Sequence, residues 1–262
     1  MQTIPERSDS IAPSSASPVG DSISTRKAAL IAGVGYLGLF FLGVFANFFV
    51  LEGLVVAGDA TATVANIRDS ESLFRAGLVG FLAIFVLDVV IAWALFVIFR
   101  PINRDFSLLT AWFRLVYTTL LGVATLFLFL TLEVASGAEY LTAFAPGQLD
   151  AQALTYLNAF NWTWLIGLMM FGIHLLLLGY MIVKSRSINP RLGYIVMVAG
   201  AAYVIDTVAH ALLGNYADYA TLFLMIVAIP AVIGEFSVTL WLLFRAGKSD
   251  ARNQAAPTTA SL

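Results

Sequence analysis

The stretch GFLAIFVLDVVIAWALF, residues 80–96, decides the fold class of this chain. Every residue in it is apolar or glycine except Asp88, whose carboxylate stands near the middle. About 20 such residues in a helix cross a hydrocarbon core roughly 30 Å thick. Lipid offers no partners to backbone amides and carbonyls, so this segment is stable there as a helix that bonds internally. We therefore expect a membrane-spanning helix with an acid near mid-depth.

Five further stretches have similar length and composition. The six expected spans cover residues 28–51, 73–99, 108–132, 162–183, 192–213 and 221–244. They are separate apolar runs without the alternation of a barrel strand, so each predicts a helix. The sequence thus predicts an all-α, polytopic integral membrane protein whose six-helix membrane domain covers residues 26–247.

The composition supports this class and excludes others. Hydrophobic residues make up 60% of the chain and charged residues 11%, with a mean hydropathy of +0.89, whereas soluble domains carry about 25% charged residues. The balance of 14 basic and 16 acidic residues includes no basic run, so nucleic acid is excluded as a partner. The absence of cysteine excludes disulfides, thiolate metal sites and cysteine nucleophiles.

Two polar segments flank the membrane domain. Residues 1–25 are rich in Ser and Pro and have too little apolar surface to fold, which predicts a disordered arm. Residues 248–262 predict a flexible tail. The first apolar run is too long, and lies too far from the start, for a signal peptide, so we expect it to be a span.

The distribution of basic residues predicts the orientation. One side of the expected topology holds eleven Lys and Arg residues: Arg7, Arg26, Lys27, Arg100, Arg104, Lys184, Arg186, Arg191, Arg245, Lys248 and Arg252. The connections on the other side hold only Arg68. The positive-inside rule then places both termini in the cytoplasm and the chain in the cytoplasmic (inner) membrane.

One short motif imitates a cofactor site. GVGYLG, residues 33–38, matches the dinucleotide pattern G-x-G-x-x-G, but that site needs a strand before the glycines and a helix start after them. Here the glycines lie inside an apolar run, so they predict a flat helix surface for close packing. No nucleophile elbow, zinc helix or P-loop motif occurs in the sequence.

The ionisable residues inside the spans carry the case for function. At a rise of about 1.5 Å per residue, Asp88, His174 and Glu235 each lie roughly 20 Å below the outer boundary. They form the candidate intramembrane polar site. Asp206 and His210 lie roughly 10 Å and 5 Å down, one turn apart on one helix face, and form a candidate outer relay.

These residues allow several interpretations. A carboxyl group in low dielectric and an imidazole can both exchange protons near neutral pH, which suits the movement of protons or cations. A structural alternative pairs Asp88 with Arg114 and bonds Asp206 to His210. A metal held by Asp88, His174 and Glu235 has acceptable ligand chemistry but no diagnostic spacing, so the metal and cofactor content stays unknown.

Several stretches resemble a known family. They are NIRDSESLFRAG (66–77), SLLTAWFRLVY (107–117), FGIHLLLLGYMIVKS (171–185), INPRLGYIVMVAGAAYVID (188–206) and GEFSVTLWLLFRAG (234–247). Together they resemble the uncharacterised prokaryotic membrane-protein family known as domain of unknown function 4386, over residues 25–247. The segment around His174 and the Gly234–Glu235 helix are the most specific pieces. The resemblance implies a bacterial or archaeal six-helix membrane protein and transfers no activity or catalytic residue.

Three functional hypotheses follow. The first is binding or transport of a small solute or ion, linked to protons, through the central polar site. The second is a membrane-embedded enzyme or metalloprotein acting on a lipidic substrate, although the sequence leans against an enzyme. The third is a non-catalytic accessory or sensor subunit. The lipid bilayer is the expected partner in all three, and the oligomeric state is open.

Overall fold

The computed structural model describes residues 23–185 and 188–247, and this part of the chain is helical without β-strands. The elements are α1 (Thr25–Gly43), the π-helix η1 (Val44–Leu51), α2 (Glu52–Leu54), α3 (Ala60–Asp69), α4 (Glu71–Phe99), α5 (Arg104–Ala135), η2 (Glu139–Ala143), α6 (Pro146–Lys184), α7 (Pro190–Leu212), η3 (Tyr216–Tyr219) and α8 (Ala220–Phe244). Most of the predicted arm, the predicted tail and Arg186 lie outside the described residues.

Six helices are long and apolar enough to cross a membrane. They are Thr25–Leu54, Glu71–Phe99, Arg104–Ala135, Pro146–Lys184, Pro190–Leu212 and Tyr216–Phe244. This confirms the all-helical class and the expected number of apolar spans, and it indicates a multi-pass membrane protein. The first span comprises α1, η1 and α2 in direct succession.

Capping residues explain why several helices begin before the apolar runs do. The Ser24 side chain accepts from the amide of Lys27, and the Asn103 side chain accepts from the amide of Phe106. These bonds satisfy amides that the first helical turn leaves free. The helices therefore start at polar caps, a few residues outside the hydrophobic boundaries.

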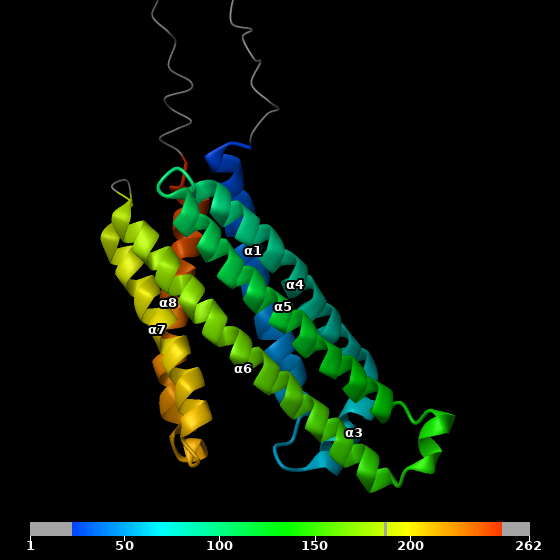
Figure 1. Cartoon of the computed structure of the whole chain (residues 1–262). Coiled ribbons are helices and arrows are strands. Elements are labelled where there is room, and N and C mark those ends of the chain that lie inside the picture. The colour runs from blue at the N-terminus through cyan, green and yellow to red at the C-terminus, as the bar shows by residue number, and fades with distance from the viewer. Residues whose placement is uncertain (1–22, 186–187, 248–262) are drawn as a thin grey trace, which may run out of the picture.

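The long connection before the fourth span differs from the expected arrangement. The fourth span was expected to cover residues 162–183. Instead, η2 is followed by α6, which starts at Pro146 and runs for 39 residues, about 58 Å at 1.5 Å per residue. That length exceeds a hydrocarbon core of about 30 Å. In Figure 1, the last part of α5 and the first part of α6 diverge from α7 and α8 toward the lower right, where α3 also lies.

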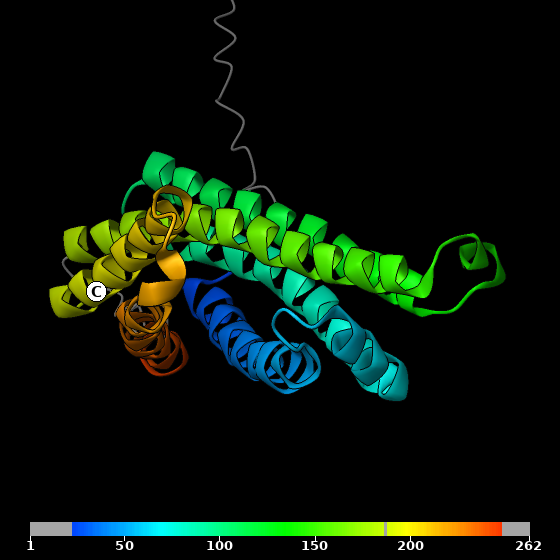
Figure 2. The same ribbon diagram turned by 90° about the horizontal axis from the view of Figure 1, so that it is seen from below.

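The six spans form a ring in chain order. Each span packs against the next one along the chain, and α8 returns to α1. Seen along the bundle in Figure 2, α1 lies between α4 and α8, while α5 and α6 form the opposite side. An aromatic cluster joins α4 to α6, where the Phe81 ring meets Phe160 and Trp164 edge to face, with centroids 5.1 and 5.9 Å away.

Glycines let α6 and α7 approach until their backbones touch. A Cβ atom at Gly172 would lie 2.7 Å from the Gly200 carbonyl oxygen, and one at Gly179 would lie 2.5 Å from that of Gly193. Each contact is reciprocal. Small residues at such crossings give membrane helices their packing attraction, because lipid supplies little hydrophobic drive between them.

The glycines of residues 33–38 do serve helix packing. A Cβ atom at Gly33 would meet the Leu243 side chain of α8 at 2.7 Å, and one at Gly35 would meet Ile91 of α4 at 2.8 Å. Helix α1 thus fits between two neighbours through its smallest residues.

One end of the α1–α8 contact is closed by an arginine. The Arg26 guanidinium donates to the carbonyl oxygens of Leu242, Leu243 and Ala246 at 3.1, 2.6 and 3.1 Å. These carbonyls end α8, where a cation also complements the helix dipole. The start of the first span and the end of the last therefore lie together at the same end of the bundle.

Candidate functional site: a polar cavity inside the helix ring

A cavity of about 310 Å³ lies inside the ring, and all six spans line it. Its lining residues are Tyr36, Leu37, Leu39, Phe40, Gly43, Ile84, Asp88, Arg114, Tyr117, Trp164, Leu168, Phe171, Tyr203, Ala228, Ala231, Val232, Glu235, Phe236 and Thr239. Most are apolar or aromatic, with a few polar groups among them. This is the usual make-up of a small-molecule site.

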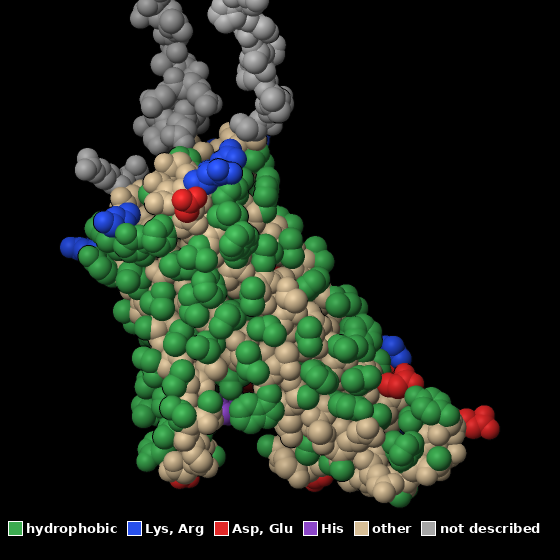
Figure 3. Space-filling model, viewed as in Figure 1, with side chains coloured by type: hydrophobic (Ala, Val, Ile, Leu, Met, Phe, Trp, Pro, Cys, Tyr) green, Lys and Arg blue, Asp and Glu red, His purple; other side chains and the backbone are tan. Residues whose placement is uncertain are grey.

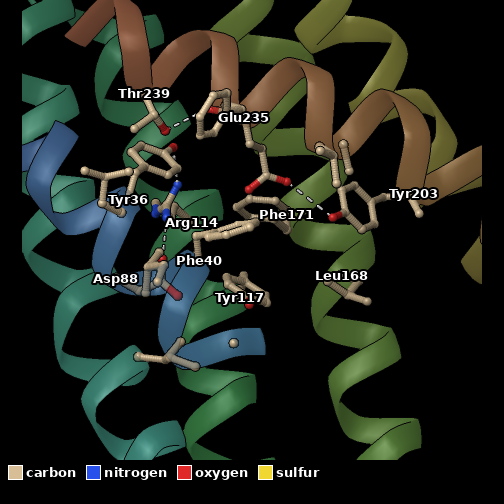
Figure 4. A pocket seen from close by; sticks show the side chains of 18 of the residues that line it. Tyr36, Phe40, Asp88, Arg114, Tyr117, Leu168, Phe171, Tyr203, Glu235 and Thr239 are labelled. Carbon is tan, nitrogen blue, oxygen red and sulfur yellow. Dashed lines mark hydrogen bonds and ion pairs between the residues drawn. The ribbon is translucent and has the colours of Figure 1, made fainter. Parts of the chain in front are cut away.

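Arg114 is the centre of the polar wall. It is fully buried on α5, and its guanidinium forms an ion pair with Asp88 of α4. It also donates to the Tyr36 hydroxyl of α1 at 2.7 Å. Figure 4 shows Asp88, Arg114 and Tyr36 converging from three helices. One arginine therefore joins α1, α4 and α5 inside the bundle.

His174 of α6 lies on the same arginine. Its Nδ1 is 2.9 Å from the Thr110 carbonyl oxygen, which can only accept. The Nδ1 atom therefore carries the proton, and Nε2 accepts from Arg114 at 3.3 Å. The imidazole stacks on Phe171 with centroids 5.6 Å apart. His174 is thus a neutral group that orients the guanidinium.

Two buried polar atoms of this wall have no hydrogen-bond partner within the part of the chain that the structure describes. They are Asp88 Oδ2 and Arg114 Nε, on side chains that are 1% and 0% exposed. Burying such atoms unpaired is costly. The ion pair is therefore incompletely satisfied beside the cavity.

Glu235 holds a different position on α8, five residues after Pro230. It is half-buried and lines the cavity. The Tyr203 hydroxyl of α7 donates to Glu235 Oε1 at 3.3 Å, and Figure 4 shows the carboxylate facing Tyr203. Among the described residues, no Lys, Arg or His forms an ion pair with Glu235. Glu235 is therefore the acid of this site that forms no ion pair with a described basic residue.

The cavity opens between α1 and α8. Of its lining residues, Phe40 of α1 is 48% exposed, and Val232 and Phe236 of α8 are 59% and 47% exposed. These three apolar side chains mark the mouth. Both flanking helices are irregular: α1 continues into the π-helix Val44–Leu51, and α8 contains Pro230. Such features interrupt the regular ladder of helix hydrogen bonds.

The candidate outer residues lie away from the cavity lining. Asp206 accepts from the Tyr216 hydroxyl at 2.6 Å. His210 stacks on the Tyr216 ring at 3.8 Å and meets Trp162 edge to face. Within the described ranges no hydrogen bond or ion pair connects Asp206 to His210. Both residues instead contact Tyr216, Asp206 through the hydroxyl group and His210 through the ring. Their role as a relay stays a prediction.

The structure brings Asp88 and His174 together on Arg114 and leaves Glu235 on a separate part of the lining. In residues 23–185 and 188–247, no group of three or more His, Asp or Glu side chains could hold a metal ion. The proposed three-residue metal site therefore gains no support from the geometry. Arg75 forms an exposed ion pair with Glu71 at 2.7 Å, outside the site.

Sequence reasoning missed the tyrosines of this site. Tyr36 bonds the buried Arg114 and Tyr203 bonds the half-buried Glu235, each across the helix ring. In the sequence they read as apolar helix residues, although tyrosine hydroxyls buried in a membrane protein need partners. That requirement is the signal that could have placed them near Arg114 and Glu235.

Comparison with known proteins gives the chain a family. A sequence profile described as domain of unknown function (DUF4386) matches residues 31–246. The chain belongs to the DUF4386 family. A protein of Archaeoglobus fulgidus, called only an uncharacterized protein, is 28% identical over 171 residues, which is 65% of this chain and 84% of that protein. No solved structure matches this chain. The DUF4386 match includes every residue that lines the cavity.

Proposed function

We propose that this DUF4386 protein binds a small solute or ion in the central cavity and moves it across the membrane in exchange with protons. The observation that carries this proposal is Glu235, a cavity acid without an ion-pair partner among the described side chains. An unpaired acid inside a membrane span is costly, and such groups mark ion and substrate pathways. Glu235 is the proposed carrier of the proton or cation.

The Asp88–Arg114 pair has a supporting role in this proposal. Its two charges cancel, and Tyr36 and His174 fix the guanidinium from two further helices. In this proposal the pair holds the polar wall in place while Glu235 alternates between binding a proton and binding the solute or ion. His174 acts through Arg114 as a positioning residue.

We also propose that the termini face the cytoplasm in the inner membrane. The helix ends on the side where α1 begins and α8 ends carry Arg100, Arg104, Lys184, Arg191 and Arg245. On the face shown in Figure 3, Lys and Arg side chains gather mostly at this end. Single cysteines at Arg104 and Thr61, which are exposed at opposite ends, test this. An impermeant maleimide added outside intact spheroplasts should label Thr61→Cys and spare Arg104→Cys, and the reverse result contradicts the orientation.

Filling the cavity tests solute binding. Ala228 lines the cavity, whereas the adjacent Ile229 is 57% exposed and outside it. The purified protein is heated with three probes of similar size: benzyltrimethylammonium, neutral neopentylbenzene and anionic phenylacetate. At least one should raise the melting temperature of the wild type and of Ile229→Phe, because a bound ligand stabilises the folded state. Ala228→Phe should lose the rise. A site in this cavity is refuted if no probe stabilises any of the three proteins. It is also refuted if a probe stabilises Ala228→Phe as much as it stabilises the wild type.

Transport is tested in liposomes with a pH-sensitive dye inside. A gradient of the bound probe should drive proton movement in the wild type and in the exposed-site control Glu139→Gln. Glu235→Gln should abolish it. Proton movement that persists in Glu235→Gln would remove Glu235 from the mechanism.

A further inference from the structure

The geometry points to a lipophilic organic cation as the solute: a protonated amine or quaternary ammonium group on an apolar body. This inference rests on the proposed function, because it names the class of solute for the same cavity. It is argued from the charge of the cavity, the aromatic walls and the position of the mouth.

The charge of the cavity favours a cation. Asp88 and Arg114 neutralise each other. His174 is neutral because its Nε2 accepts a hydrogen bond from Arg114 while its Nδ1–H donates to the Thr110 carbonyl oxygen. An ionised Glu235 then leaves one net negative charge on the lining. A cation would pair with this carboxylate in a medium of low dielectric, whereas an anion would be repelled by it.

The walls are suited to an organic cation rather than a bare metal ion. Aromatic side chains contributed by α1, α5, α6, α7 and α8 line the cavity, and the Phe171 ring contacts those of Tyr117 and Tyr203 at 4.9 and 5.6 Å. Aromatic faces attract organic cations and form the cages that bind quaternary ammonium groups. Hard metal ions instead need several oxygen ligands around one point.

The protein already places a cation against these rings. The Arg114 guanidinium carbon lies 4.9 Å from the centroid of Tyr36 and 5.3 Å from that of Phe171. The inner aromatic surface of the cavity is therefore used for cation–π contact on one side. A second cation beside Glu235 would find the same kind of surface.

The mouth fits an apolar body. Phe40, Val232 and Phe236 surround the opening between α1 and α8, on a bundle whose outer surface is hydrophobic. A molecule with a greasy body can enter through this mouth from the lipid, while a strongly hydrated ion would lose its water there. The volume of about 310 Å³ limits the solute to a small amphiphile.

Benzyltrimethylammonium and neopentylbenzene test the inference, because they share one shape and differ by one positive charge. Each ligand is titrated into the purified protein in the same detergent. The affinity of each ligand is compared between variants, so that its partitioning into the detergent cancels. Glu235→Gln should raise the Kd of benzyltrimethylammonium by at least about tenfold. It should leave the Kd of neopentylbenzene unchanged. Unchanged binding of the neutral ligand also shows that the variant is folded.

A mouth variant provides an independent check. Phe236 lines the cavity and is half-exposed, while Phe244 of the same helix is 61% exposed and outside it. Phe236→Leu should weaken the binding of benzyltrimethylammonium a few fold, because it removes an aromatic face from the cavity. Phe244→Leu should leave this binding unchanged. The effect on neopentylbenzene should be smaller than the effect on the cation.

The outcomes separate this inference from the proposed function. If neopentylbenzene or phenylacetate binds in the cavity and the cation does not, or if Glu235→Gln leaves the cation unaffected, the cation class is wrong and solute binding stands. If no probe binds and Ala228→Phe changes nothing, both fail.

Discussion

One carboxylate oxygen of Asp88 accepts from Arg114, and the other has no hydrogen bond to any residue that the structure describes. Removing one member of a buried pair strands the other charge, which costs about 3–5 kcal/mol. We expect Asp88→Asn to lower the free energy of unfolding by about that much. The double variant Asp88→Asn/Arg114→Met should recover part of the loss, because no unpaired charge remains. Unfolding in detergent measures both, and an Asp88→Asn protein as stable as the wild type would contradict a structural role for the pair.

Glu235 should respond in the opposite way. Since no ion-pair partner is stranded among the described residues, we expect Glu235→Gln to be as stable as the wild type or more so. Functional sites hold unpaired groups at a cost that neutral substitutions relieve. The melting temperature in the same detergent measures this. A loss as large as that of Asp88→Asn would mean that Glu235 also holds the helices together.

The sequence predicts residue depth, but it does not predict residue direction. Because helix rise is constant, hydropathy predicts a comparable depth for Asp88, His174 and Glu235 within their spans. It did not fix the rotation of each helix, which depends on packing against neighbours. For that reason the sequence did not predict that Asp88 and His174 both contact Arg114 while Glu235 lies apart from them. Arg114, which the sequence offered only as an alternative partner of Asp88, is the centre of the polar wall.

At the scale of elements, the glycine contacts between α6 and α7 make a prediction. A Cβ atom at Gly179 would lie 2.5 Å from both the Gly193 carbonyl oxygen and the Met197 side chain, whereas one at Gly53 would meet nothing within 4 Å. Gly179→Ala should therefore lower the free energy of unfolding by about 1–3 kcal/mol, typical of overpacking. Gly53→Ala should have little effect, because alanine favours the helix. Equal stability of both variants in detergent would show that the helices separate without cost.

The ends of elements were predicted less well than their existence. Long apolar runs are a strong signal for spans, so all six were found. The first half of α6 is polar enough on one side to resemble a surface helix, yet Leu157 and Phe160 are buried there against neighbouring helices. Protein contacts cover the apolar face of that half, and hydropathy alone does not distinguish burial against protein from burial in lipid.

On the scale of the whole molecule, the ring is closed at one end and open along its side. Arg26 ties α1 to the last carbonyls of α8, while farther along the same two helices Phe40 and Phe236 border the mouth of the cavity. The order of helices around the ring is not written in hydropathy. It follows here from close packing through Gly33 and Gly35 and from the hydrogen bonds of Arg26.

The absence of cysteine from the chain makes this mouth directly testable. Val232 and Ile229 are exposed to a similar extent, 59% and 57%, on the same helix, and only Val232 lines the cavity. Benzyltrimethylammonium should slow the reaction of Val232→Cys with a membrane-permeant maleimide and leave Ile229→Cys unaffected, because a bound cation covers one position and not the other. A bulky maleimide on Val232→Cys should in turn block binding. If the cation protects both cysteines equally, the whole face responds to it, and entry between α1 and α8 is wrong.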